Sequence, residues 1–275
     1  MSDDGQLVSP GKAISRKCLN AFLVIISIFL FQSELEAQSL EIRVAAAADL
    51  NFVMADLSGQ FEKQTGIQVK VASGSSGNFF SQIQNGAPFD LFFSADIEYP
   101  RKLAAAGFAE PETLQEYALG RIVIWTPASA KVDVAKQGWS ALVDASVQKI
   151  AIANPEHAPY GRAAVSALQK AGIYEQVKAK LIYGENISQA AQFVQSGNAQ
   201  AGIIALSLAI SPGMKGGKIW EIPAETYPPL EQGAVVLKSA KNKNAARAFL
   251  NFVKSPAGRE ILEKHGFAIP AAKQP

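Results

Sequence analysis

The sequence predicts an α/β fold made of two lobes, each built around a mixed, mostly parallel sheet. From Glu41 onward, short apolar runs typical of strands alternate with segments of helical periodicity, which is the pattern of an α/β protein. Two segments, 118–127 and 223–232, have the Gly or Pro content expected where a chain crosses between lobes. We therefore expect residues 38–120 plus 223–275 to form lobe I, residues 121–222 to form lobe II, and a ligand cleft to lie between them.

Eight apolar segments are predicted strands. They are short and rich in Val, Ile, Phe and Ala, as buried strands of such sheets are. They span residues 42–48, 67–73, 89–95, 121–127, 149–155, 180–185, 201–206 and 233–238.

Helices are predicted between these strands. After Asp49, apolar residues recur every three or four positions from Leu50 to Phe61, and Gly66 is placed to end that helix. The next helix stops at Asn85-Gly86, and one that begins near Gly161 closes on Gly172. Further helices are expected over 188–198, 244–255 and 256–266.

The first 37 residues have the features of a cleaved secretory signal. Lys12, Arg16 and Lys17 precede an uncharged run over 19–31, which is shorter than the roughly 20 residues that span a bilayer. A cut after Ala37 gives a secreted chain without cysteine, since Cys18 is the only one. The alternative is an uncleaved anchor helix.

Composition and motifs exclude several classes of function. The formal net charge is +2 and the Lys and Arg residues are scattered, which argues against a nucleic-acid partner. His157 and His265 lie far apart in the sequence without a cysteine, so no metal site is expected. The GSSG segment is neither a nucleophile elbow nor a phosphate-binding loop.

The junctions between strands and helices carry the chemistry that we expect. A helix start has unpaired N–H groups and a partial positive charge, so several starts at one cleft form an anion site without cationic side chains. Ser75 and Ser76 open one helix, where the N–H groups of Ser76, Gly77 and Asn78 are candidate donors. Plain N-capping is the alternative for these serines, as it is for Asp49 and Asn186.

Six motifs in one order resemble a known family. They are RVAAAADL, SGSSGNFFSQIQNGAPFDLFFSAD, YALGRIVIW, IANPEHAPYG, YGENISQAAQFVQSGNAQAGIIAL and KHGFAIP. Together they cover nearly all of residues 41–270, and they resemble the periplasmic molybdate-binding proteins of ABC importers. These are type II periplasmic binding proteins, whose two lobes close on molybdate or tungstate through hydroxyl and main-chain N–H donors.

The resemblance implies a set of contacts in this chain. The expected ligand-binding residues are Asp49, Ser76, Tyr160 and, through its main chain, Ile187, with Ala48, Ser75, Asn186 and Ala205 as further candidates. Ala205 stands where some relatives have a tyrosine, and we expect the Tyr160 hydroxyl to replace that contact.

Asp49 stands where many relatives have Ser or Asn. An ionised carboxylate about 4 Å from a dianion would be repelled by roughly 8 kcal/mol at an effective dielectric constant of about 20. Each hydrogen bond to a charged ligand returns only about 1.5–3 kcal/mol. We therefore expect the carboxylate to cap the helix and the main chain alone to meet the ligand. The alternative is that it accepts a hydrogen bond from a protonated anion such as hydrogenphosphate.

The expected function is that of an extracytoplasmic, periplasmic solute-binding protein that captures molybdate or tungstate. We expect a monomer without cofactor or nucleic-acid partner, which hands its ligand to a membrane permease with a cytoplasmic ATPase. The alternatives are a binding protein for phosphate, sulfate or ferric ion, and a secreted hydrolase using Ser76 with His157. No third residue that would orient such a pair is identifiable.

Overall fold

The computed structural model of the chain describes residues 40–271. Leu40–Pro275 is one compact unit by its internal contacts. The predicted signal sequence, including Cys18 and Ala37, lies outside the described residues. In the described part, no helix combines the length and the apolar character that a membrane crossing requires.

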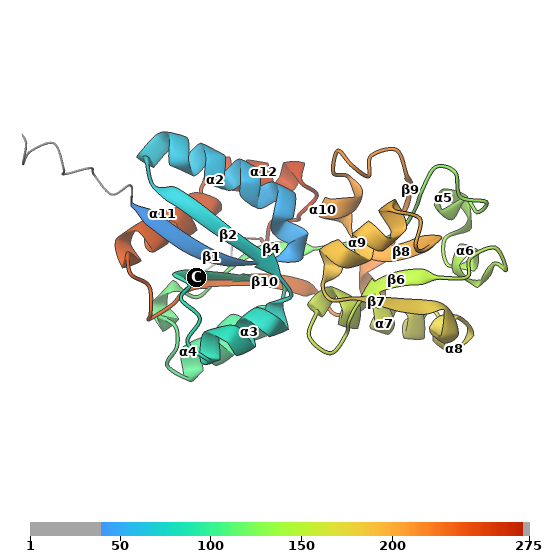
Figure 1. The fold of residues 1–275 in the computed structure, drawn as a ribbon, viewed down its shortest axis with the longest axis horizontal. Helices are drawn as coiled ribbons and strands as arrows, with labels where there is room; N and C mark the ends of the chain where they lie inside the picture. The colour runs from blue at the N-terminus through green and yellow to red at the C-terminus, as the bar shows by residue number, and fades with distance from the viewer. Residues whose placement is uncertain (1–39, 272–275) are drawn as a thin grey trace, which may run out of the picture. The chain divides into compact units, whose positions relative to one another are not determined.

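The first sheet belongs to lobe I and has the strand order β2-β1-β3-β10-β4 (Figure 1). β1, β2 and β3 are parallel, β10 runs against β3, and β4 runs against β10. Four strands therefore point the same way and β10 alone is reversed. The strands are β1 (Glu41–Ala47), β2 (Gln68–Gly74), β3 (Leu91–Ser94), β4 (Gln115–Gly120) and β10 (Leu230–Val236).

The second sheet, in lobe II, repeats this plan with the order β7-β6-β8-β5-β9. β6, β7 and β8 are parallel, whereas β5 is antiparallel to both of its neighbours, β8 and β9. The strands are β5 (Ile122–Thr126), β6 (Ile150–Ala153), β7 (Leu181–Gly184), β8 (Ala201–Ala205) and β9 (Lys218–Glu221). The predicted two-lobe α/β fold with mostly parallel sheets is thus confirmed.

Helices cover both faces of each sheet. In lobe I these are α2 (Asn51–Thr65), α3 (Ser76–Gln84), α4 (Glu98–Ala105), α11 (Lys243–Lys254) and α12 (Pro256–Lys264), with 3-10 turns η1 (Ala48–Leu50) and η2 (Pro111–Thr113). In lobe II they are α5 (Val134–Gln137), α6 (Ser140–Val143), α7 (Pro159–Lys170), α8 (Tyr174–Val177), η3 (Lys178–Lys180), α9 (Ile187–Gln195) and α10 (Leu206–Ala209). The turn η4 (Ala224–Thr226) lies in the second crossing.

Alternation along the strands divides the core of lobe I into two layers. Val44 and Phe93 pack on the side of α2 and α11, where the Phe61 and Phe249 rings meet at a centroid distance of 5.1 Å. Ala45 and Phe92 face the other way, in the cluster that contains residues of α3 and α4. Figure 1 shows α2 and α3 on opposite sides of the sheet. Successive strand residues point to opposite faces, so one apolar run supplies both layers.

The chain changes sheets twice. β4 ends at Gly120 in the first sheet and β5 begins at Ile122 in the second, so a single residue, Arg121, joins them. The return runs from β9 to β10 through residues 222–229. The first crossing lies within the predicted segment 118–127, and the second overlaps the predicted segment 223–232. We accordingly propose the lobe boundaries given above for residues 40–271.

The sequence prediction missed the edge strands β4 and β9 and the four-residue helices α5, α6, α8 and α10. β4 was not predicted, because its polar residues Gln115 and Glu116 interrupt the apolar pattern of a strand that lies at the sheet edge. β9 is also an edge strand, and its side chains are only partly buried or exposed. α4 carries Pro100 in its first turn, where proline is tolerated. Gly66 ends α2 as predicted, with a left-handed φ of 72°.

Candidate functional site

Four helix starts meet at one small cavity between the lobes. η1 and α3 reach it from lobe I, whereas α7 and α9 reach it from lobe II. The cavity volume is about 10 Å³, far below the roughly 300–1,000 Å³ of pockets for drug-sized ligands. The lining residues are Ala47, Ala48, Asp49, Gly74, Ser75, Ser76, Ala95, Ala158, Pro159, Tyr160, Asn186 and Ile187.

At the start of α3 the two serines have different roles. Ser75 is the N-cap, and its Oγ accepts from the Asn78 N–H at 3.4 Å. Ser76 is fully buried, and its Oγ accepts from the Ala95 N–H at 3.0 Å. Its hydroxyl hydrogen and its main-chain N–H have no recorded acceptor among residues 40–271. Ser76 is therefore the serine with donors to spare for a ligand.

The start of α9 also combines one capping residue with one residue whose donor is available. Asn186 caps the helix, and its Oδ1 accepts from the Gln189 N–H at 3.0 Å. The capping interpretation of Asn186 is thus correct. Ile187 is the first helical residue, and no acceptor within the described chain is recorded for its N–H. Its main chain is therefore available for a contact in the cavity.

The start of α7 places the side chain of Tyr160 at the cavity. Pro159 occupies the first helical position, where a missing N–H costs nothing. Tyr160 follows it, is 2 % exposed, and donates from its OH to Asp49 Oδ2 at 3.0 Å across the two lobes. Tyr160 thus lines the cavity while it holds the carboxylate opposite.

Asp49 belongs to a buried hydrogen-bond network rather than to a helix cap. Its Oδ2 also accepts from Gln232 Nε2 at 2.5 Å, and Tyr117 OH donates to Gln232 Oε1 at 2.6 Å. No side-chain cap bond is recorded at the start of η1 or α2. The predicted capping role of Asp49 is therefore wrong, because two buried donors, Tyr160 and Gln232, compete for the carboxylate.

Burial dominates the electrostatics of this network. Desolvation raises the pKa of Asp49 to about 6, although the hydrogen bonds from Gln232 and Tyr160 act in the opposite direction. Burial, and next the Asp49 charge, raise the pKa of Tyr160 and of Tyr117 well above the usual range of a phenol. Both tyrosines therefore stay protonated and act as hydrogen-bond donors.

Gln232 and Tyr117 are parts of the site that sequence reasoning missed. Both are buried, one on β10 and one on β4. A glutamine at the beginning of an apolar strand was the available signal, because a buried amide needs partners. The partners themselves lie 115 and 183 positions away.

The lobes also contact each other directly around the cavity. The Gly77 N–H donates to the His157 carbonyl at 2.9 Å, so this predicted ligand donor is already used. The Asn78 N–H is likewise taken by the Ser75 cap. Asn51 Nδ2 donates to Ser188 Oγ at 3.0 Å, and Ser207 Oγ donates to the Asp49 carbonyl at 2.8 Å.

Two predicted residues lie apart from this arrangement. Ala205 ends β8, where it pairs with Ile122, and it does not line the cavity. The His157 ring bonds the Glu185 carbonyl at 2.9 Å, and within residues 40–271 no hydrogen bond joins it to Ser76. The pair required by the hydrolase alternative is therefore not assembled.

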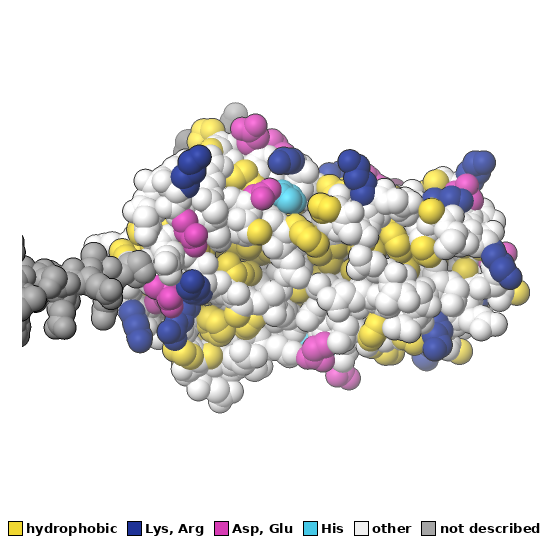
Figure 2. Space-filling view, turned by 45° about the horizontal axis from the view of Figure 1, so that its top comes forward, with side chains coloured by type: hydrophobic (Ala, Val, Ile, Leu, Met, Phe, Trp, Pro, Cys, Tyr) yellow, Lys and Arg dark blue, Asp and Glu magenta, His cyan; other side chains and the backbone are white. Residues whose placement is uncertain are grey.

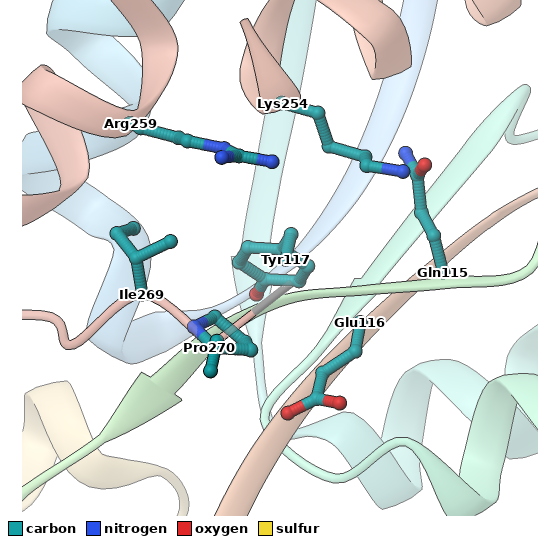
Figure 3. Close-up of a pocket in the computed structure, with 8 residues that line it drawn as sticks. Gln115, Glu116, Tyr117, Lys254, Arg259, Ile269 and Pro270 are labelled. Carbon is teal, nitrogen blue, oxygen red and sulfur yellow. The ribbon is translucent and has the colours of Figure 1, made fainter. Parts of the chain in front are cut away.

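Cationic side chains are absent from the described wall of the cavity, where Asp49 is the charged residue. Lys and Arg are distributed over the face that Figure 2 shows. A wider cavity in lobe I does have two cations on its wall, Lys254 and Arg259. Figure 3 shows them near the ring of Tyr117, with Ile269 and Pro270 close by. Among residues 40–271, no junction from a strand to a helix lines this cavity.

Comparisons with known proteins agree with this architecture. The family model described as bacterial extracellular solute-binding protein matches residues 42–268. The chain is 41 % identical over 234 residues to a molybdate-binding protein, ModA, of Azotobacter vinelandii, which covers 85 % of this chain and 92 % of the relative. A ModA of Rhodobacter capsulatus is 40 % identical, with coverage of 85 % and 90 %.

Solved structures agree as well. The periplasmic molybdate-binding protein of Azotobacter vinelandii superposes with a TM-score of 0.79 at 36 % identity, covering 84 % of this chain and 100 % of that one. A sulfate-binding protein, SubI, of Mycobacterium tuberculosis shares the fold at 16 % identity and a TM-score of 0.67, covering 85 % and 88 %.

A two-lobed fold with helix starts around one interlobe cavity defines a protein that encloses a small solute. The chain belongs to the bacterial extracellular solute-binding protein family.

Proposed function

We propose that this protein captures molybdate or tungstate outside the cytoplasm for an ABC transporter. The observation that carries the proposal is the cavity wall, where unpaired N–H and O–H donors from both lobes meet and no cationic side chain is present among the described residues. Such donors bind an anion by replacing its water shell. The molybdate-binding names of the relatives at 40–41 % identity support the choice of anion.

The proposed contacts come from four junctions. Ser76 donates its hydroxyl and N–H, Tyr160 and Ile187 donate their main-chain N–H groups from lobe II, and Asp49 with its neighbour Ala48 closes the lobe I side. Ser75 and Asn186 support these contacts as helix caps. The lobes close about the ion, as binding proteins with hinged domains do.

The remaining parts of the proposal concern delivery. The loaded monomer binds a membrane permease whose cytoplasmic ATPase drives import, and it carries no cofactor and catalyses no reaction. A relative in Bacillus subtilis, 28 % identical, is named a putative ABC transporter substrate-binding lipoprotein. We propose that the segment before Gln38 is a secretory signal, removed in the periplasm.

The experiment is calorimetric titration of the purified protein with molybdate, tungstate, sulfate and phosphate. Molybdate and tungstate should bind, and at 100 times the dissociation constant they should stabilise the fold by about 2.7 kcal/mol. Ser76→Ala should weaken binding about 10- to 100-fold, since a hydrogen bond to a charged ligand contributes about 1.5–3 kcal/mol. Ser81→Ala, at an exposed serine of the same helix, is the matched control.

Phosphate is the second candidate, and the free Oδ1 of Asp49 is the observation in its favour, because it can accept from a protonated anion. Tight phosphate binding without a response to molybdate or tungstate would replace the first proposal by this one.

A further inference from the structure

One oxygen of the Asp49 carboxylate has no partner in the described structure. The residue is 1 % exposed, it lines the cavity, and its Oδ1 is buried without a hydrogen bond among residues 40–271. Buried polar atoms are nearly always paired. Ser58 Oγ, Thr126 Oγ1 and Asp133 Oδ1 are also buried without a partner in this part of the chain. Asp49, however, is the residue of this group that lines the cavity, so its Oδ1 is the atom available to a ligand there.

The network determines which oxygen of Asp49 can carry a proton. Gln232 Oε1 accepts from Tyr117 OH, so the amide nitrogen of Gln232 faces Asp49 and donates to Oδ2. The same nitrogen donates to Tyr160 OH at 3.1 Å, which leaves the Tyr160 hydrogen for Oδ2. Because Oδ2 already accepts twice, a proton on this carboxyl lies on Oδ1.

Among residues 40–271, no positive charge near Asp49 compensates a second anion. The ionisable groups that face it are Tyr160 of α7 and Tyr117 of β4, and both are neutral phenols. α9 and α10, which pack against η1, carry no ionisable side chain. On β2 the ionisable side chain is that of Lys70, which is exposed. On α2 they are those of Asp56, which bonds His265 at 2.8 Å, and of Glu62 and Lys63 farther along the helix.

We propose that Asp49 enters the complex as a neutral carboxylic acid whose Oδ1–H donates to a ligand oxygen, so that a protein whose Asp49 is ionised takes up one proton when it binds a dianion. This inference rests on the proposed function and adds a rule of selectivity to it. When the ligand is a fully deprotonated dianion, the proton on Asp49 must come from solvent. When the ligand is hydrogenphosphate, its own proton can form the hydrogen bond to Asp49. Burial that already favours the protonated carboxyl lowers the cost of this step.

Proton uptake is directly measurable. Molybdate is titrated calorimetrically into the full mature chain at one pH in several buffers with different ionisation enthalpies. Well above pH 6, close to one proton should be taken up per ion, and affinity should fall about tenfold per pH unit. Well below pH 6, uptake should approach zero, because Asp49 is then protonated before the ligand arrives.

Asp49→Asn is the matched variant. Its Oδ1 can accept from Tyr160 and Gln232 in place of the carboxylate Oδ2, and its Nδ2 can donate to the ligand in place of the acid O–H. It should bind molybdate without proton uptake and with an affinity that does not change with pH. Asp56→Asn, which removes a carboxylate that pairs with His265 away from the cavity, should keep the slope of the wild-type protein.

The outcomes separate the two proposals. Binding of molybdate by the wild-type protein at pH 8 with no proton uptake and a flat affinity overturns this inference and leaves the proposed function standing. No binding of molybdate or tungstate at any pH overturns the proposed function. Should Asp49→Asn fail to fold, infrared difference spectra of the wild-type protein decide, since the carbonyl band of a protonated carboxyl must appear on binding at pH 8.

Discussion

Arg162 of α7 and Asp96, which follows β3, form an ion pair from one lobe to the other, with 2.7 Å between Nη2 and Oδ2. Arg162 also donates to Tyr99 OH at 3.2 Å. These contacts exist only while the lobes are together, so they favour the closed arrangement without touching the cavity wall.

Arg162→Ala should therefore weaken ligand binding modestly. A partly exposed ion pair contributes up to about 1 kcal/mol, which corresponds to a loss of affinity of at most about fivefold. The effect should shrink at high salt because the pair is screened. Titrations at two salt concentrations measure it, and Arg101→Ala, which removes an exposed ion pair with Glu98 inside α4, should change nothing.

Gly77→Ala should block closure while lobe I stays folded. An added Cβ would lie 2.7 Å from the His157 carbonyl oxygen of the opposite lobe. Overpacking of this kind costs typically about 1–3 kcal/mol, so affinity should fall about 5- to 100-fold. Small-angle scattering with ligand should show a more open molecule. Gly59→Ala in α2, where a Cβ meets nothing, should bind normally; equal binding by both variants would contradict the closed arrangement.

Asp49 should make the ligand-free protein less stable as pH rises. Its folded pKa of about 6 exceeds its ordinary value of 3.8, so the folded state holds the proton more tightly than the unfolded state. The stabilisation is complete below about pH 4 and is lost as pH rises through about 6, with a difference on the order of 3 kcal/mol. Urea unfolding of wild type and Asp49→Asn across this range should show the variant gaining relative stability toward pH 8.

Glu110 should have the opposite pH dependence. Burial opposes its ionisation, but hydrogen bonds from Arg247 and Lys243 of α11 outweigh burial and lower the pKa of Glu110 below 4.5. Its stabilisation is therefore present above that pH and is lost as pH falls through the folded pKa. Glu110→Gln should cost about 1–3 kcal/mol at pH 7 and less in acid.

The control for Glu110 is a neighbour. Glu112 contacts Arg247 at 3.1 Å with a side chain that is 64 % exposed, so Glu112→Gln should cost less than about 0.5 kcal/mol. A similar loss for both variants in urea unfolding would show that the buried position of Glu110 is unimportant.

The sequence was sufficient for the parts of the fold that depend on local pattern. The helix from Asn51 to Gly66 and the sheet built on the run from Ile42 follow from periodicity and from a helix-ending glycine. β4 and β9 escaped because edge strands mix polar and apolar residues, which leaves little alternation to detect.

The candidate site was predictable where a helix begins within three residues of the end of a strand, as at Ser76 and Ile187. The environment of Asp49 was not, because its partners lie on other elements and no local signal pairs them. The N–H of Gly77 was misassigned for the same reason, since its acceptor at His157 comes from the opposite lobe.

Tyr117 and Gln232 lie on β4 and β10, the two strands through which the chain leaves and re-enters lobe I. Tyr117 lies three residues before the end of β4, and Gln232 lies two residues after the start of β10. Both are therefore close to the segments that connect the lobes. Because Tyr117 bonds Gln232 and Gln232 bonds Asp49, we expect a rotation about the connecting segments to shift the partners of the carboxylate. Domain rotation and the protonation of Asp49 should therefore be coupled.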